Sequence, residues 1–259
     1  MSDILGERDA AVPKDLTRVA EPSRESQLPK RFYDVASVEP GEGGFLIQLD
    51  GRSVKTPGRA TLAFSSPDIA QRVADEWQAQ SERIDPLTMP MTRLANTALD
   101  GVASDMQAVK EDIVRYAGTD MLCYRADRPD GLVNRQNALW DPLIDWAQAG
   151  LGVRLALAQG VVHVAQPQAS IAAFNVHLGA IDDPLALAAL HVATSITGSA
   201  VIAMALYKGE SDLPTAWEAA HVDEDWNIAE WGEDEEAKQR RAARHVDMEA
   251  AAFVLGQSA

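Results

Sequence analysis

The chain has 259 residues, with 39 aspartate and glutamate residues against 23 lysine and arginine residues, which gives a net charge of −16. This charge repels nucleic acid phosphates and anionic lipid head groups, so we expect neither nucleic acid nor a membrane as a partner. Apolar residues make up 46% and charged residues 24%, which is typical of a globular rather than a disordered protein. The single cysteine, Cys123, excludes an internal disulfide and a metal site built from several cysteines.

The first 29 residues lack the apolar core of a secretory signal peptide. They also carry acidic residues, which organelle transit peptides avoid. We therefore expect residues 1–29 to form a flexible N-terminal tail on a cytoplasmic protein.

Residues 30–88 predict a small β-rich N-terminal domain. Strands are expected at 31–35, 45–49 and 52–55, with a short further strand at 61–64. The turn residues at 40–44 separate the first two strands. Asp50-Gly51 predicts a tight hairpin turn, because both positions tolerate positive φ.

Helical patterns begin at Ser66-Pro67-Asp68, which combines a capping serine, a proline at the first helical position and an acid in the first turn. This helix should end before Asp85-Pro86. A second pattern follows Met91, and we expect Gly101 to split it. Further helices are predicted at 132–146, 171–178, 184–206, 214–230 and 234–255, with a weak extended stretch at 153–164.

The predicted fold class is therefore α+β, with a small antiparallel β-rich N-terminal domain at 30–88 and a larger, mostly α-helical domain at 89–259. Residues 185–206 carry no formal charge, but polar residues such as His191 and Thr194 are costly in lipid. We predict a helix buried inside the helical domain rather than a membrane span. Ser195 and Ser199 are expected to be core hydroxyl groups that bond to the preceding turn.

Catalytic signatures are absent from the sequence: it has no glycine-rich phosphate loop, no His-Glu-x-x-His pair and no nucleophile elbow. The apolar neighbours of Cys123 favour a buried, inert thiol over a nucleophile. The strongest metal candidate is His221 with Asp225 one turn later, joined by Glu218. The competing interpretation of these three residues is a solvated helix face, and we predict no cofactor.

The segment 217–236 stands out because it carries three tryptophans and nine carboxylates without any lysine or arginine. Uncompensated charge on neighbouring helical turns costs folding stability. One interpretation is an acidic surface whose tryptophans point inward, with Gly232 ending one helix and Asp234 beginning the next. The other is a site for a basic protein surface, with aromatic anchors ringed by acids. The two interpretations are compatible.

Several short motifs occur together in this chain. They are Arg31-Phe32-Tyr33, Leu49-Asp50-Gly51-Arg52, Lys55-Thr56-Pro57, Glu76-Trp77-Gln78-Ala79-Gln80, Ile84-Asp85-Pro86, Met89-Pro90-Met91-Thr92-Arg93-Leu94-Ala95-Asn96-Thr97-Ala98-Leu99-Asp100, Asp223-Glu224 and Trp231-Gly232. Their combination resembles the assembly chaperones of the F-type ATP synthase alpha subunit. The resemblance covers roughly residues 30–255.

The resemblance implies a non-enzymatic chaperone with a β-rich N-terminal domain before a helical domain. Members of that family hold the unassembled alpha subunit of the catalytic head on the surface later taken by the beta subunit. They occur in mitochondria and in related bacteria. We therefore expect a monomeric, cytoplasmic protein without a cofactor, whose partner is the alpha subunit.

The client is expected to contact the acidic segment. The predicted acidic contacts are Glu218, Asp223, Glu224, Glu233 and Asp234, with Trp226 and Trp231 anchoring or positioning that surface. Trp77, Met89, Pro90 and Thr92 match the family's stretch, and we expect them to be architectural. Pro90 should fix a turn between two helices, and a cis peptide before it stays open.

Two other classes of function are alternatives to the assembly-chaperone hypothesis. One is a metal- or carboxylate-dependent hydrolase that uses Glu218, His221 and Asp225. The other is a generic acidic scaffold that binds basic partners without selectivity.

Overall fold

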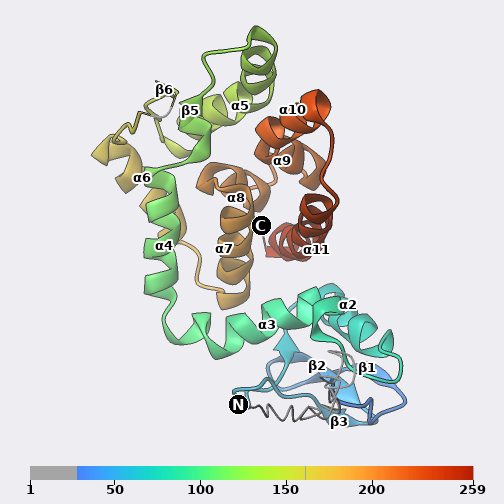
Figure 1. The fold of residues 1–259 in the computed structure, drawn as a ribbon. Coiled ribbons are helices and arrows are strands. Elements are labelled where there is room, and N and C mark those ends of the chain that lie inside the picture. Colours follow the sequence, from blue (N-terminus) through green and yellow to red (C-terminus); the bar gives the residue numbers. More distant parts are fainter. Residues whose placement is uncertain (1–27, 161, 259) are drawn as a thin grey trace, which may run out of the picture.

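The computed structural model describes residues 28–160 and 162–258. It has the predicted α+β fold, in which a small antiparallel sheet precedes a mostly helical region (Figure 1). Residues 1–27, which make up almost all of the predicted N-terminal tail, lie outside the described residues. Val161, in the predicted extended stretch, also lies outside them.

The sheet is organised around β2 (Gly44–Leu49). This strand pairs with β1 (Ala36–Gly41) on one side and with β3 (Arg52–Ser53) and β4 (Ala63–Phe64) on the other, all antiparallel. Asp50 and Gly51 have φ values of 48° and 76° and form the predicted tight turn between β2 and β3.

The predicted strand at 31–35 is wrong, because β1 begins at Ala36. Side chains occupy the backbone groups of this segment instead. The N–H groups of Asp34 and Val35 donate to the Asp50 carboxylate, at 3.1 and 2.9 Å. The Arg31 guanidinium donates to the carbonyl oxygens of Tyr33 and Asp34, at 2.9 and 2.8 Å. These groups are therefore not available for a strand ladder.

The helices that follow the sheet begin and end largely where predicted. α2 (Pro67–Gln78) is capped by Ser66, whose Oγ accepts from the N–H of Ile69 at 3.4 Å. η1 (Pro86–Thr88) and α3 (Pro90–Asp100) follow. Gly101 separates α3 from η2 (Val102–Ser104) and α4 (Met106–Gly118), as predicted. Pro90 opens α3 through a trans peptide bond.

The remaining elements build the helical region. They are η3 (Met121–Cys123), β5 (Tyr124–Arg125), α5 (Asp130–Leu151), β6 (Ala158–Gln159), α6 (Gln168–Gly179), α7 (Pro184–Thr197), α8 (Ala200–Tyr207), α9 (Leu213–Ala220), α10 (Val222–Trp231) and α11 (Glu235–Ser258). β5 and β6 form a short parallel pair. α7 lies at the centre, in contact with α3, α4, α8 and α11 (Figure 1).

The predicted helix at 184–206 consists of two helices, α7 and α8. Gly198 ends α7 with a φ of 67°, and the Oγ of buried Ser199 accepts from the N–H of Ile202 at 3.0 Å. Ser199 is thus in the core, as predicted. The sequence predicts a hydrogen bond from its hydroxyl group to the preceding turn, but the hydroxyl caps the following helix instead. Ser195 is exposed rather than in the core. No helix in the described ranges combines the length and the apolar character needed to cross a bilayer.

The N-terminus of α3 is capped from another helix. The Glu76 carboxylate on α2 accepts from the N–H groups of Met91 and Thr92, at 2.6 and 2.8 Å, and from the Thr92 hydroxyl at 2.7 Å. These are two of the N–H groups that an α-helix leaves unpaired at its start. Burial raises the pKa of Glu76, and the hydrogen bonds from Thr92 and Met91 oppose that rise. Since α2 packs on β1 and β2, this cap joins α3 to the sheet.

A second carboxylate, Asp120, is fully buried where η3 meets α8. Its oxygens accept from the N–H groups of Leu122 and Val201, at 3.1 and 3.0 Å. Desolvation raises the pKa of Asp120 from 3.8 to about 6, against the lowering effect of its hydrogen bonds. The charged form is therefore tolerated in the core at a cost in stability.

Replacing Glu76 with alanine should lower the free energy of unfolding by about 3 kcal/mol, because a hydrogen bond to a charged group contributes about 1.5–3 kcal/mol and three donors, two N–H groups and the Thr92 hydroxyl, lose their partner. Chemical denaturation measures the change. Asp75→Ala is the matched control, since the carboxylate of the neighbouring Asp75 is exposed and accepts from Gln71, at 2.8 Å, rather than from the start of a helix. Equal losses in the two variants would contradict the capping role.

Asp120 should make stability depend on pH. Its folded pKa lies above its ordinary value, so the folded state binds a proton between about pH 4 and 6 that the unfolded state has lost. The contribution of this group to the free energy of unfolding is thus present at low pH and is lost as the pH rises through about 6. The stability of Asp120→Asn relative to the parent should therefore improve between pH 4 and 7, by at most about 3 kcal/mol.

The control for this pH series is Asp212→Asn. Asp212 also caps a helix, α9, but its carboxylate is exposed and its hydrogen bonds to Thr215 lower its pKa. The relative stability of this variant should change with pH in the opposite direction. Parallel pH profiles for the two variants would overturn the assignment of Asp120.

Candidate functional site

The acidic segment 217–236 folds into α9, α10 and the first turn of α11, which lie beside one another (Figure 1). The predicted continuous helix at 214–230 is broken at His221, between α9 and α10. Gly232 ends α10, as predicted. Asp234 precedes α11, and its carboxylate accepts from the N–H of Ala237 at 2.8 Å. The predicted boundary between the last two helices is therefore confirmed.

The charge of this segment is partly compensated by cations of α11. Arg244 lies 3.4 Å from Glu224, and Lys238 lies 3.2 Å from Glu233, in each case between the charged atoms. Arg241 pairs with Asp225 at 2.5 Å. All three cations lie beyond residue 236, so the segment taken alone contains no lysine or arginine to compensate its charge. A basic stripe at three- and four-residue spacing in α11 was the signal that could have revealed the pairing.

Two of the predicted contact residues fasten α10 to α5. The carboxylate of Asp223 accepts from Nε2 of Gln136 at 2.7 Å. The ring of Trp226 lies against Gly131, where an added Cβ would come within 2.5 Å of the indole. Any larger residue at position 131 would therefore displace Trp226. The ring of Trp226 thus points toward α5. This orientation suits a residue that positions the acidic surface better than one that anchors the client.

Trp231 differs from Trp226, because its side chain is 86% exposed. It lies on a shallow groove of about 450 Å³ between α10 and α11. Apolar atoms of Ile228 and Ala237 also line the groove. Charged and polar residues complete the lining: Glu224, Asn227, Gly232, Glu233, Asp234, Lys238 and Arg241. Glu218 is exposed on the neighbouring α9. The surface thus offers one large aromatic side chain inside a charged rim.

The predicted metal constellation is not formed. His221 is buried, and its Nδ1 lies 2.8 Å from the carbonyl oxygen of Trp217. Burial lowers the pKa of His221, so the neutral ring is favoured. Asp225 faces Arg241 instead of the histidine. Within 28–160 and 162–258, no three side chains of metal-binding type are grouped closely enough to hold an ion.

The four motif residues predicted to be architectural lie around the Glu76 cap, at the other end of the molecule from α10 (Figure 1). Met89 and Thr92 are buried, and Pro90 is the first residue of α3. The ring of Trp77 packs edge-on against Tyr33, with 5.8 Å between ring centroids. The positions are compatible with a role in holding α2, α3 and the sheet together.

Cys123 is buried, as predicted. Burial, with a further contribution from Asp120, raises the pKa of its thiol to about 12. Almost no thiolate is present at neutral pH, so this residue lacks the property that a cysteine nucleophile needs.

Comparison with known proteins gives consistent matches. Residues 30–148 match the family model described as ATP12 chaperone protein. The chain is 23% identical over 222 residues to the mitochondrial protein atp12 of Schizosaccharomyces pombe, covering 81% of this chain and 76% of that protein.

Two solved structures are also similar. The Atu1473 protein of Agrobacterium tumefaciens is 51% identical, with a TM-score of 0.84 over 92% of this chain and 91% of that one. Atp12 of Paracoccus denitrificans is 37% identical, with a TM-score of 0.82 over 89% of this chain and 99% of that one.

The two tryptophans of α10 should respond differently to substitution. Trp226→Ala should destabilise the protein by about 3 kcal/mol, because removing a large packed side chain leaves a cavity against Gly131. Trp231→Ala should change stability by less than about 0.5 kcal/mol, because the side chain is exposed. Chemical denaturation of both variants measures this difference, and a large loss for Trp231→Ala would show that this ring packs within the protein.

Proposed function

This chain belongs to the ATP12 family of ATP synthase assembly chaperones, and we propose that its client is the unassembled alpha subunit of the F-type ATP synthase. The family is one of chaperones rather than enzymes. An isolated ring subunit exposes interface area that would otherwise aggregate, which is the hazard a dedicated chaperone removes. We propose that this protein covers the interface that the alpha subunit later presents to the beta subunit.

The surface formed by α9, α10 and the start of α11 is the proposed contact region. The observation that carries this assignment is the 86% exposure of Trp231 on a groove with a charged rim. Exposed tryptophans at concave sites are typical anchors of protein interfaces. The proposed contacts remain Glu218, Asp223, Glu224, Trp226, Trp231, Glu233 and Asp234, with Trp226 acting by holding α10 in place.

Charge at the rim suits a chaperone that must release its client. Acidic rim residues accelerate encounter with a basic surface through long-range attraction, and they contribute less to the rate of dissociation. Glu224 and Glu233 already have partners on α11, so their charge is shared. Glu218 forms no ion pair with another described residue and offers its full charge to a client.

We further propose that the protein acts as a monomer in the bacterial cytoplasm, with residues 30–88 and 89–259 as its two domains and no catalytic activity of its own. The bacterial proteins from Agrobacterium and Paracoccus are 51% and 37% identical, compared with 23% for the mitochondrial relative. Size exclusion of the purified protein tests the monomer.

The client assignment is tested with the isolated alpha subunit of the same organism's ATP synthase. Light scattering should show that the full chain suppresses aggregation of this subunit, and size exclusion should show a discrete complex. Addition of the beta subunit should dissociate that complex. Protection of an unrelated aggregating protein, or binding to unrelated basic proteins that salt abolishes, would favour the generic acidic scaffold.

The double variant Glu218→Lys/Trp231→Ala should weaken binding of the alpha subunit at least tenfold, because it removes one anchor and reverses one rim charge. Both side chains are exposed, so the fold should be retained. Isothermal titration calorimetry measures the affinity. Glu42→Lys, on the exposed hairpin of β1 and β2, reverses one charge as well and is the charge control. Unchanged affinity of the first variant would place the contact surface elsewhere.

A further inference from the structure

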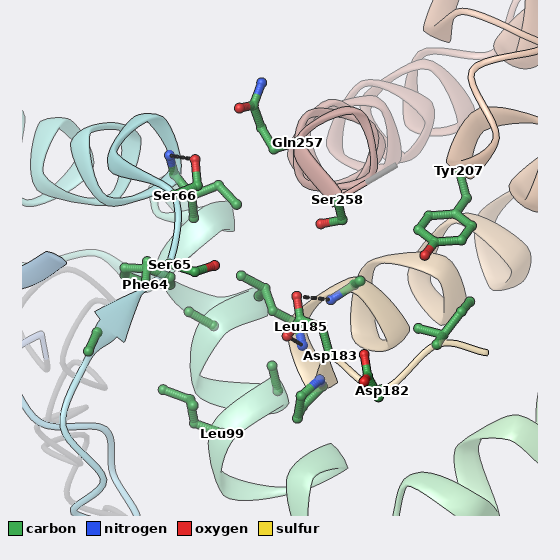
Figure 2. Close-up of a pocket in the computed structure, with 17 residues that line it drawn as sticks. Phe64, Ser65, Ser66, Leu99, Asp182, Asp183, Leu185, Tyr207, Gln257 and Ser258 are labelled. Atoms are coloured by element: carbon green, nitrogen blue, oxygen red, sulfur yellow. Dashed lines mark hydrogen bonds between the residues drawn. The ribbon is translucent and has the colours of Figure 1, made fainter. Parts of the chain in front are cut away.

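A second concave site lies far from the acidic surface, where α2 and α3 meet α7, α8 and α11 (Figure 2). Its cavity has a volume of about 220 Å³. Pockets for drug-sized ligands have volumes of roughly 300–1,000 Å³, so this cavity suits a single side chain better than a nucleotide.

The walls of the cavity are largely apolar. Phe64 from the end of β4 is buried at one side, and Leu99 of α3 and Leu185 of α7 are partly exposed within it. The ring of Tyr207, at the end of α8, closes the opposite side (Figure 2). Such walls can cover the aliphatic stem of a long side chain whose polar head lies elsewhere.

Two adjacent carboxylates, Asp182 and Asp183, lie at one end of the cavity (Figure 2). Asp183 caps α7 by accepting from the N–H groups of Leu185 and Ala186, at 3.0 and 3.4 Å. Asp182 is exposed. Neither carboxylate forms an ion pair with a lysine, arginine or histidine in the part of the chain that the structure describes.

Three cations on or beside the helices of this region contact other groups. Lys110 donates to the carbonyl oxygen of Gly179 at 3.4 Å. The ammonium of Lys208 lies 4.9 Å from the centroid of its neighbour Tyr207. Arg72 packs its guanidinium over the ring of Phe253, at 4.0 Å from the centroid. Within the described residues, the negative charge of Asp182 and Asp183 is therefore not paired with a cation of the protein itself.

The ends of three helices lie at the cavity and carry partial charges. α2 and α7 begin there with a partial positive charge, but Ser66 accepts from one N–H group of α2 and Asp183 accepts from two of α7. α11 ends there with Gln257 and Ser258, and the C-terminal end of a helix carries a partial negative charge. Asp182 and Asp183 carry two full negative charges, against a partial charge of about half a unit at each helix end, so the field favours a cation.

We propose that this cavity binds one basic side chain, of arginine or lysine, supplied by a protein partner. The stem would pack against Leu99, Leu185 and Tyr207, and the cationic head would donate to Asp182 and Asp183. The hydroxyl of Ser65, which faces the cavity in Figure 2, offers a further acceptor. The partner is the client, so this assignment rests on the proposed function. The cavity would give the client a second contact, at the place where β4, α2 and α3 meet α7, α8 and α11.

The cavity is tested first without the client. Acetyl-Ala-Arg-Ala-amide, its lysine analogue and the neutral citrulline analogue are titrated into the isotope-labelled full chain to tens of millimolar, and amide NMR shifts are followed. The arginine and lysine peptides should shift amides around Asp182, Leu99 and Tyr207, with affinities about tenfold tighter than that of citrulline, because the cavity selects positive charge.

Asp182→Asn/Asp183→Asn should abolish the preference for arginine over citrulline. Asparagine is as good a helix cap as aspartate, so α7 should be retained. Glu39→Gln/Glu42→Gln changes the net charge equally at a distant exposed hairpin and should leave the titration unchanged. The proposal would be overturned if the peptides shift no amide signals around the cavity, or if the arginine and citrulline peptides bind equally well. It would also be overturned if inorganic phosphate shifts the same amide signals.

Binding measurements with the alpha subunit distinguish failure of this proposal from failure of the proposed function. If the alpha subunit binds the parent protein, Asp182→Asn/Asp183→Asn should weaken that binding about tenfold, since a partly desolvated ion pair is lost. Normal binding by this variant would overturn the cavity as a client contact while the proposed function stands. If the alpha subunit does not bind the parent protein at all, the proposed function fails, and the peptide titration alone decides the cavity.

Discussion

The carboxylate of Glu76 at the start of α3 is the interaction on which the arrangement of this protein depends. It joins the helix that covers the sheet to the helix that packs on α7 and α11. Without it, two N–H groups at the start of α3, between the sheet and the helical region, would lose their partner. Asp120 performs a similar task deeper in the helical region, where it holds η3 against the start of α8. In both cases a carboxylate removed from water accepts hydrogen bonds from backbone N–H groups at the start of a helix.

The strongly acidic segment becomes tolerable through α11. That helix brings Lys238, Arg241 and Arg244 beside the carboxylates of α10 and the turn that follows it. The pairing lowers the repulsion within the segment while Glu218 and Trp231 stay exposed. A surface of this kind can be stable and still bind a basic partner, as the proposed function requires.

The two proposed contact sites lie at opposite ends of α11. Its first turn borders the groove at Trp231, and its last residues border the cavity at Asp182. A helix of 24 residues is about 36 Å long, at about 1.5 Å per residue. A short peptide cannot bridge both sites, whereas a folded subunit can. Simultaneous engagement of both would make binding selective for a large client and would let loss of one contact begin release.

Much of this protein follows from local sequence. The α+β class, the turn at Asp50-Gly51, the cap at Ser66 and the breaks at Gly101 and Gly232 depend on neighbouring residues, whose backbone preferences act within a few positions. The family itself was recognisable from short motifs. The splits at Ser199 and His221 were missed, because an apolar or acidic pattern can continue across a helix break.

Only the tertiary structure decided which charges are paired and which side chains are exposed. Trp226 and Trp231 occur in the same acidic helix, yet one packs on Gly131 and the other faces solvent. The segment at 31–35 has strand-forming residues, but Asp50 and Arg31 take its backbone groups. The cavity at Asp182 is assembled from five segments distant in sequence. These features depend on which elements meet in space, and long-range packing is not encoded in the periodicity of any one segment.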